Sequence, residues 1–161
     1  MVGLLAAAFV LSSPDIASGS TIAAAHVWNR DGCHGGNVSP ALRWSGVPPE
    51  TKSLALVMFD PDAPTGHGWY HWLVWDVPAS AAAFERGRVV AGAHEGRNEF
   101  GTQGYGGPCP PPGPAHRYQW TLYALRTERL GVAPGAPWAT VMQAIGRQRF
   151  AETRLEARYG R

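Results

Sequence analysis

The chain has 161 residues and a formal net charge of +2, with 45% hydrophobic and 16% charged residues. This length predicts a single domain, and the hydrophobic fraction excludes a disordered chain. The small charge, with basic residues scattered along the sequence, argues against nucleic-acid binding. The 20 glycines and 14 prolines indicate many turns and few long helices.

The first residues are apolar but do not resemble a membrane span. Residues 1–11 lack a basic start and are too short to cross a bilayer, which takes about 20 residues. Residues 1–8 are therefore expected to be either the remnant of a secretory signal segment or a disordered extension. Residues 9–161 are expected to form the single domain.

The predicted strands are spread over the whole domain. Residues 53–60 form a continuous apolar run, the pattern of a central strand buried on both faces. A helix is predicted over about residues 138–150, where Pro137 suits the first turn. The other strands are expected, in chain order, at residues 9–13, 42–44, 71–77, 116–125 and 152–159. This pattern predicts a mainly β, antiparallel domain.

Two segments carry most of the chemistry, DPDAPTGHGWYHWLVWD at residues 60–76 and GYGGPCPPPGPAHRYQWTLYAL at 104–125. Each has a rigid Pro/Gly turn that leads to a histidine at the mouth of a strand, His71 or His116. If the two strands are neighbours, both imidazoles and Asp60 converge on one concave spot. A carboxylate beside an imidazole favours its cationic form, which binds phosphate or carboxylate groups.

Further residues of these segments have expected roles. The segment Gly106-Gly107-Pro108 can let consecutive backbone N–H groups form an anion-binding nest, although glycine and proline content alone would favour a stiff surface loop without a ligand. Strand alternation places Tyr118 on the same face as His116, with Arg117 on the opposite face. Asp62 is expected to be a structural turn residue that caps backbone N–H groups.

The same residues allow other chemistries. His71, His116 and Asp60 form a conceivable two-histidine, one-carboxylate metal site, but no ligand pair has a diagnostic spacing. No serine or cysteine lies in a nucleophile elbow. Cys33 and Cys109 are either two separate thiols or one disulfide, and their Gly-rich loops favour pairing.

The motifs resemble those of a known family. DPDAP at 60–64, GWYHW at 68–72 and GYGGPCPPPGPAHRY at 104–118 are similar to the phosphatidylethanolamine-binding protein family, also called the Raf kinase inhibitor protein family. NVSPALRWSGVP at 37–48 and GRNEFGTQGYGG at 96–107 resemble its bacterial branch. The resemblance extends from about Phe9 to the end of the chain.

The resemblance implies a fold and a ligand site. The expected fold is a central antiparallel sheet packed on a smaller sheet, with a few flanking helices and a small cavity for phosphate, acetate or a phosphoethanolamine head group. By analogy, the ligand-binding residues would be Asp60, Ala63, Pro64, His71, Gly107, Pro108, His116 and Tyr118. Cys33 and Cys109 resemble the pair of exported bacterial relatives, which implies a disulfide and a periplasmic or secreted location, with a cytoplasmic location as the alternative.

Two departures from the animal members bear on function. The loop before His116 is longer and richer in proline, and the sequence shows no counterpart of the animal C-terminal helix, which argues against kinase inhibition. The expected function is therefore non-enzymatic binding of a small anionic ligand, with no cofactor and no metal. The alternatives are a regulator of a kinase or protease acting through the cavity rim, or a phosphate-ester hydrolase. Besides the ligand, the expected partners are an unidentified protein or a second copy in a homodimer.

Overall fold

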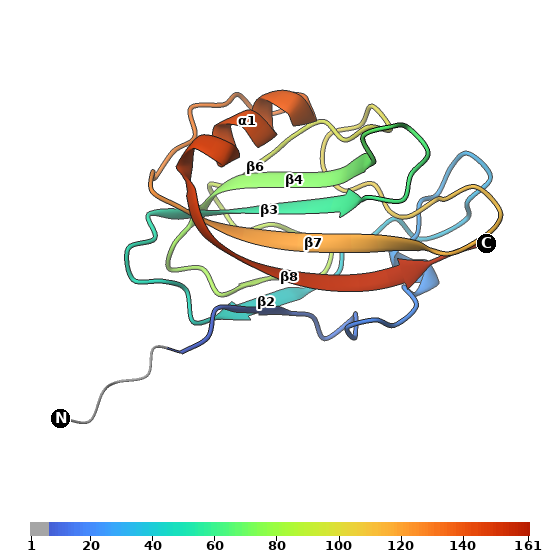
Figure 1. Ribbon diagram of the computed structural model, residues 1–161, viewed down its shortest axis with the longest axis horizontal. Helices are drawn as coiled ribbons and strands as arrows, with labels where there is room; N and C mark the ends of the chain where they lie inside the picture. Colours follow the sequence, from blue (N-terminus) through green and yellow to red (C-terminus); the bar gives the residue numbers. More distant parts are fainter. Residues whose placement is uncertain (1–6) are drawn as a thin grey trace.

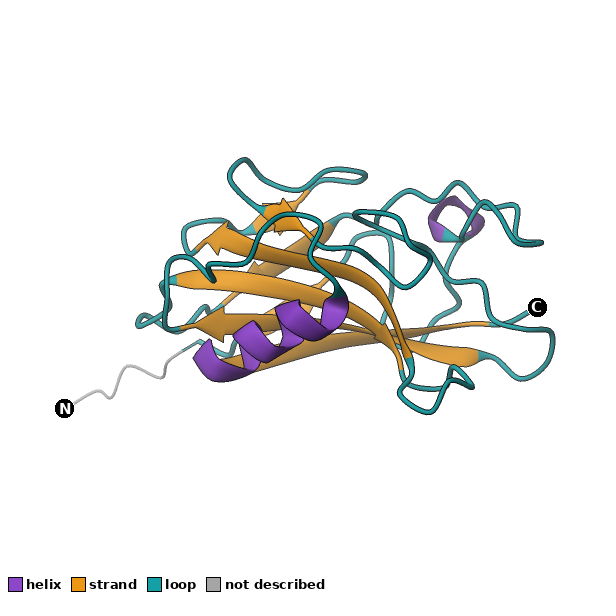
Figure 2. Ribbon diagram, turned by 90° about the horizontal axis from the view of Figure 1, so that it is seen from above, coloured by secondary structure: helices purple, strands orange, loops and turns teal. Residues whose placement is uncertain are grey.

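The structure, a computed structural model, describes residues 7–161, so most of the segment expected to be a signal remnant or extension lies outside the described residues. Two antiparallel sheets make up the architecture (Figures 1 and 2). The smaller sheet has the order β1-β2-β5 and the larger β6-β4-β3-β7-β8. The strands are β1 (Val10–Ser12), β2 (Leu42–Ser45), β3 (Ser53–Asp60), β4 (Trp69–Pro78), β5 (Ala83–Phe84), β6 (His94–Glu95), β7 (His116–Leu125) and β8 (Arg149–Tyr159).

Helices contribute little to the described part of the chain. The α-helix α1 (Trp138–Gln148) begins directly after Pro137, as expected, and the short 3-10 helix η1 (Ala24–His26) precedes β2. Strand β8 starts at Arg149, immediately after α1, and is longer at its start than the segment predicted from alternation. The expected mainly β fold with a larger and a smaller sheet is confirmed.

Strand β3 lies at the centre of the larger sheet and is buried on both faces, as its continuous apolar sequence predicts. Leu54, Leu56 and Met58 pack toward the smaller sheet in the main core. Ala55 and Val57 point the other way, into the second core beneath α1. Figure 1 shows β3 between β4 and β7, with α1 over one face and β2 beyond the other.

The antiparallel register brings three strand ends to one edge of the sheet. Asp60, the last residue of β3, pairs with Trp69 at the start of β4. Phe59 pairs with Gln119, near the start of β7. The side chains at the end of β3 and at the beginnings of β4 and β7 are therefore neighbours, although their sequence positions are far apart.

A disulfide joins the loop after η1 to the proline-rich loop that precedes β7. Cys33 and Cys109 form this bond across a sequence separation of 76 residues, so the pairing expected from the resemblance is confirmed. The Trp28 N–H donates to the Pro108 carbonyl (3.1 Å) beside it. The two loops are thus tied to each other at the edge where the strand ends meet. Within the described residues, no helix is long and apolar enough to span a membrane.

Replacing both cysteines with alanine should lower the free energy of unfolding by about 4 kcal/mol, because the bridge restricts a long loop of the unfolded chain. Urea denaturation of the wild type and of the double variant measures this difference. A reducing agent should bring the unfolding midpoint of the wild type close to that of the variant and leave the variant unchanged. Equal midpoints without reductant would contradict the expectation.

Candidate functional site

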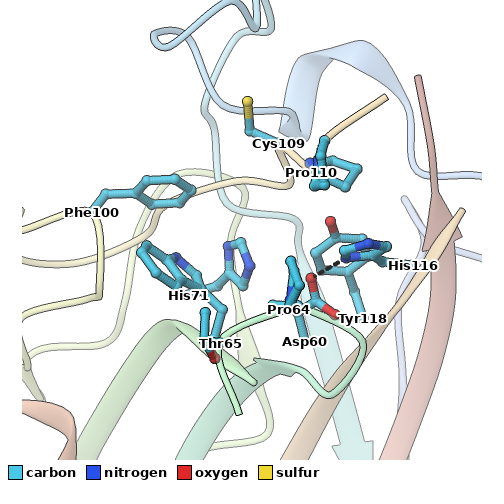
Figure 3. A pocket seen from close by; sticks show the side chains of 12 residues that line it. Asp60, Pro64, Thr65, His71, Phe100, Cys109, Pro110, His116 and Tyr118 are labelled. Atoms are coloured by element: carbon cyan, nitrogen blue, oxygen red, sulfur yellow. Dashed lines mark hydrogen bonds and ion pairs between the residues drawn. The ribbon is translucent and has the colours of Figure 1, made fainter. Parts of the chain in front are cut away.

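A cavity of about 220 Å³ opens where β3 ends and β4 and β7 begin (Figure 3). Its walls are mostly apolar, with a few polar groups between them. Six of the eight expected ligand-binding residues line it: Asp60, Ala63, Pro64, His71, His116 and Tyr118. The sequence therefore predicted most of one continuous site, drawn from the turn after β3 and the first residues of β4 and β7.

Asp60 and His116 form the polar centre of one wall. Asp60 is 3% exposed, and its Oδ2 atom accepts a hydrogen bond from Nδ1 of His116 (2.7 Å; dashed in Figure 3). Its Oδ1 atom accepts the Asp62 N–H (2.8 Å). Because a carboxylate oxygen only accepts, Nδ1 of His116 carries a proton and Nε2 is the nitrogen left for a ligand.

His71 lies on another wall and is only 2% exposed. Its Nδ1 atom donates to the carbonyl of Gly106 (2.7 Å). Burial lowers the pKa of His71 from 6.5 to about 4, against the opposing effects of the Gly106 carbonyl and the Asp60 carboxylate. The ring is therefore neutral near pH 7 with its single proton on Nδ1, which differs from the cationic imidazole expected beside Asp60.

Two hydrogen-bond donors of the cavity lack protein partners. The hydroxyl of Tyr118 and the indole N–H of Trp69 are both buried, and neither has a hydrogen-bond partner within 3.5 Å among residues 7–161. The Asp60 carboxylate is near the Tyr118 hydroxyl and contributes to raising its pKa. Burial raises the pKa of Tyr118, so its hydroxyl keeps its proton. An unsatisfied buried donor costs about 1–3 kcal/mol. Both residues line the cavity, and an acceptor placed against either donor would recover that free energy.

Asp62 and Arg117 lie outside the cavity and form an ion pair. The guanidinium of Arg117 donates to Asp62 (2.7 Å), and so does the Arg117 backbone N–H (2.9 Å). The hydrogen bond from Arg117 lowers the pKa of Asp62 to about 2. Asp62 is structural, as expected, but it anchors the start of β7, whereas Asp60 caps the turn. The expected orientation of Arg117 away from the cavity agrees with this pair.

Gly107 and Pro108 are not among the residues that line the cavity. The Gly107 N–H donates to Oδ1 of Asn37 (2.8 Å), which makes it unavailable for a ligand. A Cβ atom on Gly107 would lie 2.1 Å from the backbone oxygen of His26 and 2.7 Å from the nitrogen of Trp28. The close approach that requires glycine here is therefore to the protein's own backbone, and the expected nest at these two residues is not formed.

The remaining lining residues were not identified from the sequence. They are Thr65, Trp69, Phe100, Cys109, Pro110 and Pro111. Phe100 stacks on Trp28 (centroids 4.1 Å apart) and presents its edge to His71 (5.5 Å), so it forms an aromatic wall. The motif GWYHW contained the signal for Trp69, since a tryptophan two residues before His71 shares its face of β4. Phe100 lies in an irregular loop, where no periodicity could have identified it.

The alternative of a metal site is not supported by the geometry. Within residues 7–161, no group of three or more His, Cys, Asp or Glu side chains is arranged to hold a metal ion. The Nδ1 atoms of both histidines are already engaged, by Gly106 and by Asp60.

Gly107→Ala should destabilise the fold strongly, because the added Cβ would overlap backbone atoms that cannot shift independently. Gly146→Ala is the matched control, since a Cβ at Gly146 in α1 meets nothing within 4 Å. Alanine in a helix interior should stabilise the protein by about 0.5–1 kcal/mol. Thermal unfolding of the two variants should therefore shift in opposite directions, and a neutral Gly107→Ala would contradict the packing role.

His71 should make the stability depend on pH. Its pKa in the folded protein lies below 6.5, so unfolding takes up a proton in the interval between about 4 and 6.5. The free energy of unfolding should fall as the pH drops through this interval, by up to about 3 kcal/mol from this group. Urea unfolding between about pH 4 and 6.5 should show that the free energy of unfolding depends less on pH in His71→Asn than in the wild type. Parallel pH dependences of the two proteins would contradict the predicted effect of His71.

Comparison with known proteins agrees with the fold and the motifs. A sequence model of the phosphatidylethanolamine-binding protein family matches residues 12–160. The UPF0098 protein YbcL of Escherichia coli K12 is 41% identical over 162 residues, covering 96% of this chain and 88% of YbcL. The crystal structure of Escherichia coli YbcL, described as a new member of the mammalian PEBP family, is also similar. It superposes with a TM-score of 0.93 at 39% sequence identity, and the match covers 96% of this chain and 99% of the YbcL chain.

A mycobacterial relative is also similar. LppC of Mycobacterium tuberculosis H37Rv, which is named as a lipoprotein, is 38% identical over 146 residues, covering 90% of this chain and 69% of LppC. The family match extends over almost the whole described domain, and the resemblance seen in the motifs is confirmed. The chain belongs to the phosphatidylethanolamine-binding protein family.

Proposed function

We propose that this protein binds a small oxyanion in the cavity at the ends of β3, β4 and β7, as a binding protein without catalytic activity. The ligand class is phosphate, a carboxylate or a phosphoethanolamine-type head group. The observation that carries the proposal is the pair of buried donors without protein partners, Tyr118 and Trp69. Both residues line a cavity of about 220 Å³, which suits a small ligand.

His116 supplies the third group for the anion. Its Nδ1 atom is held by Asp60, so the ring has a fixed orientation and its Nε2 atom remains available. With Nδ1 held by Asp60, an anion that enters the cavity meets this ring at Nε2.

The other polar groups of the cavity have structural partners, which favours binding over catalysis. The hydroxyl of Thr65 donates to the Gly68 carbonyl. Both carboxylate oxygens of Asp60 are engaged, by Asp62 and by His116. A hydroxyl nucleophile needs a base within hydrogen-bond distance, and the Thr65 hydroxyl instead donates to a backbone carbonyl.

We further propose that the protein acts in an oxidising compartment outside the cytoplasm. The disulfide between Cys33 and Cys109 supports this, because such bonds persist mainly in secreted and periplasmic proteins. The relative LppC, named as a lipoprotein, supports the same location.

NMR titration with phosphate and with O-phosphoethanolamine tests the binding function. The indole N–H resonance of Trp69 and the ring signals of His116 should shift and saturate, because both groups gain an anionic acceptor. His116→Ala should weaken binding at least about tenfold, consistent with loss of a charge-assisted hydrogen bond. His34→Ala is the control, since His34 is exposed and does not line the cavity.

Absence of shifts at millimolar ligand would overturn the proposed function. The regulator of a kinase or protease would then become the leading hypothesis. Release of alcohol from a phosphate ester, lost in His116→Ala, would favour the hydrolase instead.

A further inference from the structure

The proton position on the His71 ring restricts which oxyanions fit the cavity. We propose that Nε2 of His71 acts as a hydrogen-bond acceptor and selects ligands that carry a hydroxyl on the anionic group. The ligand class is then inorganic phosphate, or a phosphate monoester in its singly ionised form, in preference to sulfate, a carboxylate or a phosphate diester. This inference rests on the proposed function and narrows its ligand.

The His71 ring is held in one orientation by Gly106. Nδ1 of His71 donates to the Gly106 carbonyl (2.7 Å), and the Gly106 N–H donates back to the His71 carbonyl (2.9 Å). The edges of Phe100 and Tyr118 pack against the ring, with centroids 5.5 and 5.2 Å away. A flipped ring would place a carbon against the Gly106 carbonyl, so the proton stays on Nδ1 and Nε2 is left to accept.

The charged groups around His71 do not change this assignment. Asp60 of β3 and Glu99 of the loop before Phe100 both favour a proton on the ring, as does the Gly107 carbonyl. Each carboxylate is already engaged, Asp60 by His116 and Glu99 by the Tyr70 N–H (2.7 Å). Burial outweighs their effect and holds the pKa of His71 at about 4, so the ring stays neutral in the physiological range.

A neutral imidazole acceptor discriminates between oxyanions of the same shape. Inorganic phosphate keeps at least one P–OH group in both ionisation states present near neutral pH, and a phosphate monoester keeps one only in its singly ionised form, below a pKa of about 6. This P–OH group can donate to Nε2 of His71. Sulfate, acetate and phosphate diesters have only acceptor oxygens there, and two acceptors facing each other in a buried site repel. The donors Tyr118 and Trp69 suit the unprotonated oxygens, so donor and acceptor groups together match a protonated phosphate.

Calorimetric titration with phosphate and sulfate tests the proposal directly. At mildly alkaline pH, phosphate is mostly a dianion with one hydroxyl and matches sulfate in charge and shape. The wild-type protein should bind phosphate at least about tenfold more tightly than sulfate, a difference of about 1.4 kcal/mol.

Two variants separate the acceptor from the donors. In His71→Asn, the side-chain amide keeps a donor for the Gly106 carbonyl but removes the acceptor at the Nε2 position, so the ratio of the two affinities should fall toward one. Tyr118→Phe is the matched control, because it removes a donor that serves both anions. It should weaken phosphate and sulfate alike and leave their ratio unchanged.

The outcomes distinguish this inference from the function on which it rests. Equal wild-type affinities for phosphate and sulfate would overturn the selectivity and leave anion binding standing. Binding of neither anion would overturn both. A ratio that survives in His71→Asn would overturn the role of this ring. If that variant does not fold, ¹⁵N NMR of the wild-type ring decides: a proton on Nε2 without ligand would overturn the assignment, and a proton on Nδ1 would support it.

Discussion

The carboxylate of Asp60 joins the two halves of the cavity, because one oxygen accepts the Asp62 N–H and the other holds Nδ1 of His116. The first bond closes the turn after β3, and the second fixes a side chain at the start of β7. Asp60 is almost fully buried, so each of these bonds lies in surroundings of low polarity, where it is stronger than in water. The orientation of His116 toward a ligand depends on this one group.

A second constraint acts on the opposite rim. The disulfide fixes Cys109, and Cys109, Pro110 and Pro111 form part of the cavity wall. The guanidinium of Arg161 donates to the Pro110 carbonyl (2.6 Å) and so ties the same loop to the end of the chain. Because prolines and a covalent bond restrict this loop, the proposed binding would need little additional ordering of the rim. A rigid rim also keeps the hydrogen-bonding groups in fixed positions, which would make the proposed binding more selective.

The sequence predicted the parts of the site that follow from strand pattern. Asp60, His71 and His116 stand at the ends of clearly apolar strands, and antiparallel pairing brings such ends together. The prediction that the Gly107 backbone approaches a ligand was wrong. A glycine that permits a close approach gives the same sequence signal whether the neighbour is a ligand or, as here, the backbone of residues 26–28. Trp69 was missed because a tryptophan near a strand start is most simply read as core. The proton on His71 depends on burial and on a loop carbonyl, which no local pattern reveals.

The chemistry of the cavity thus depends on the backbone as much as on its side chains. The position of the His71 proton is set by the Gly106 carbonyl. Gly106 itself packs so closely against Phe100 that a side chain at this position would have no room. A relative with the same two histidines and the same aspartate would present a donor in place of an acceptor if that carbonyl pointed elsewhere. Identical ligand-facing residues therefore do not guarantee an identical ligand within this family, because the loop at residues 104–107 decides which ring nitrogen of His71 carries the hydrogen.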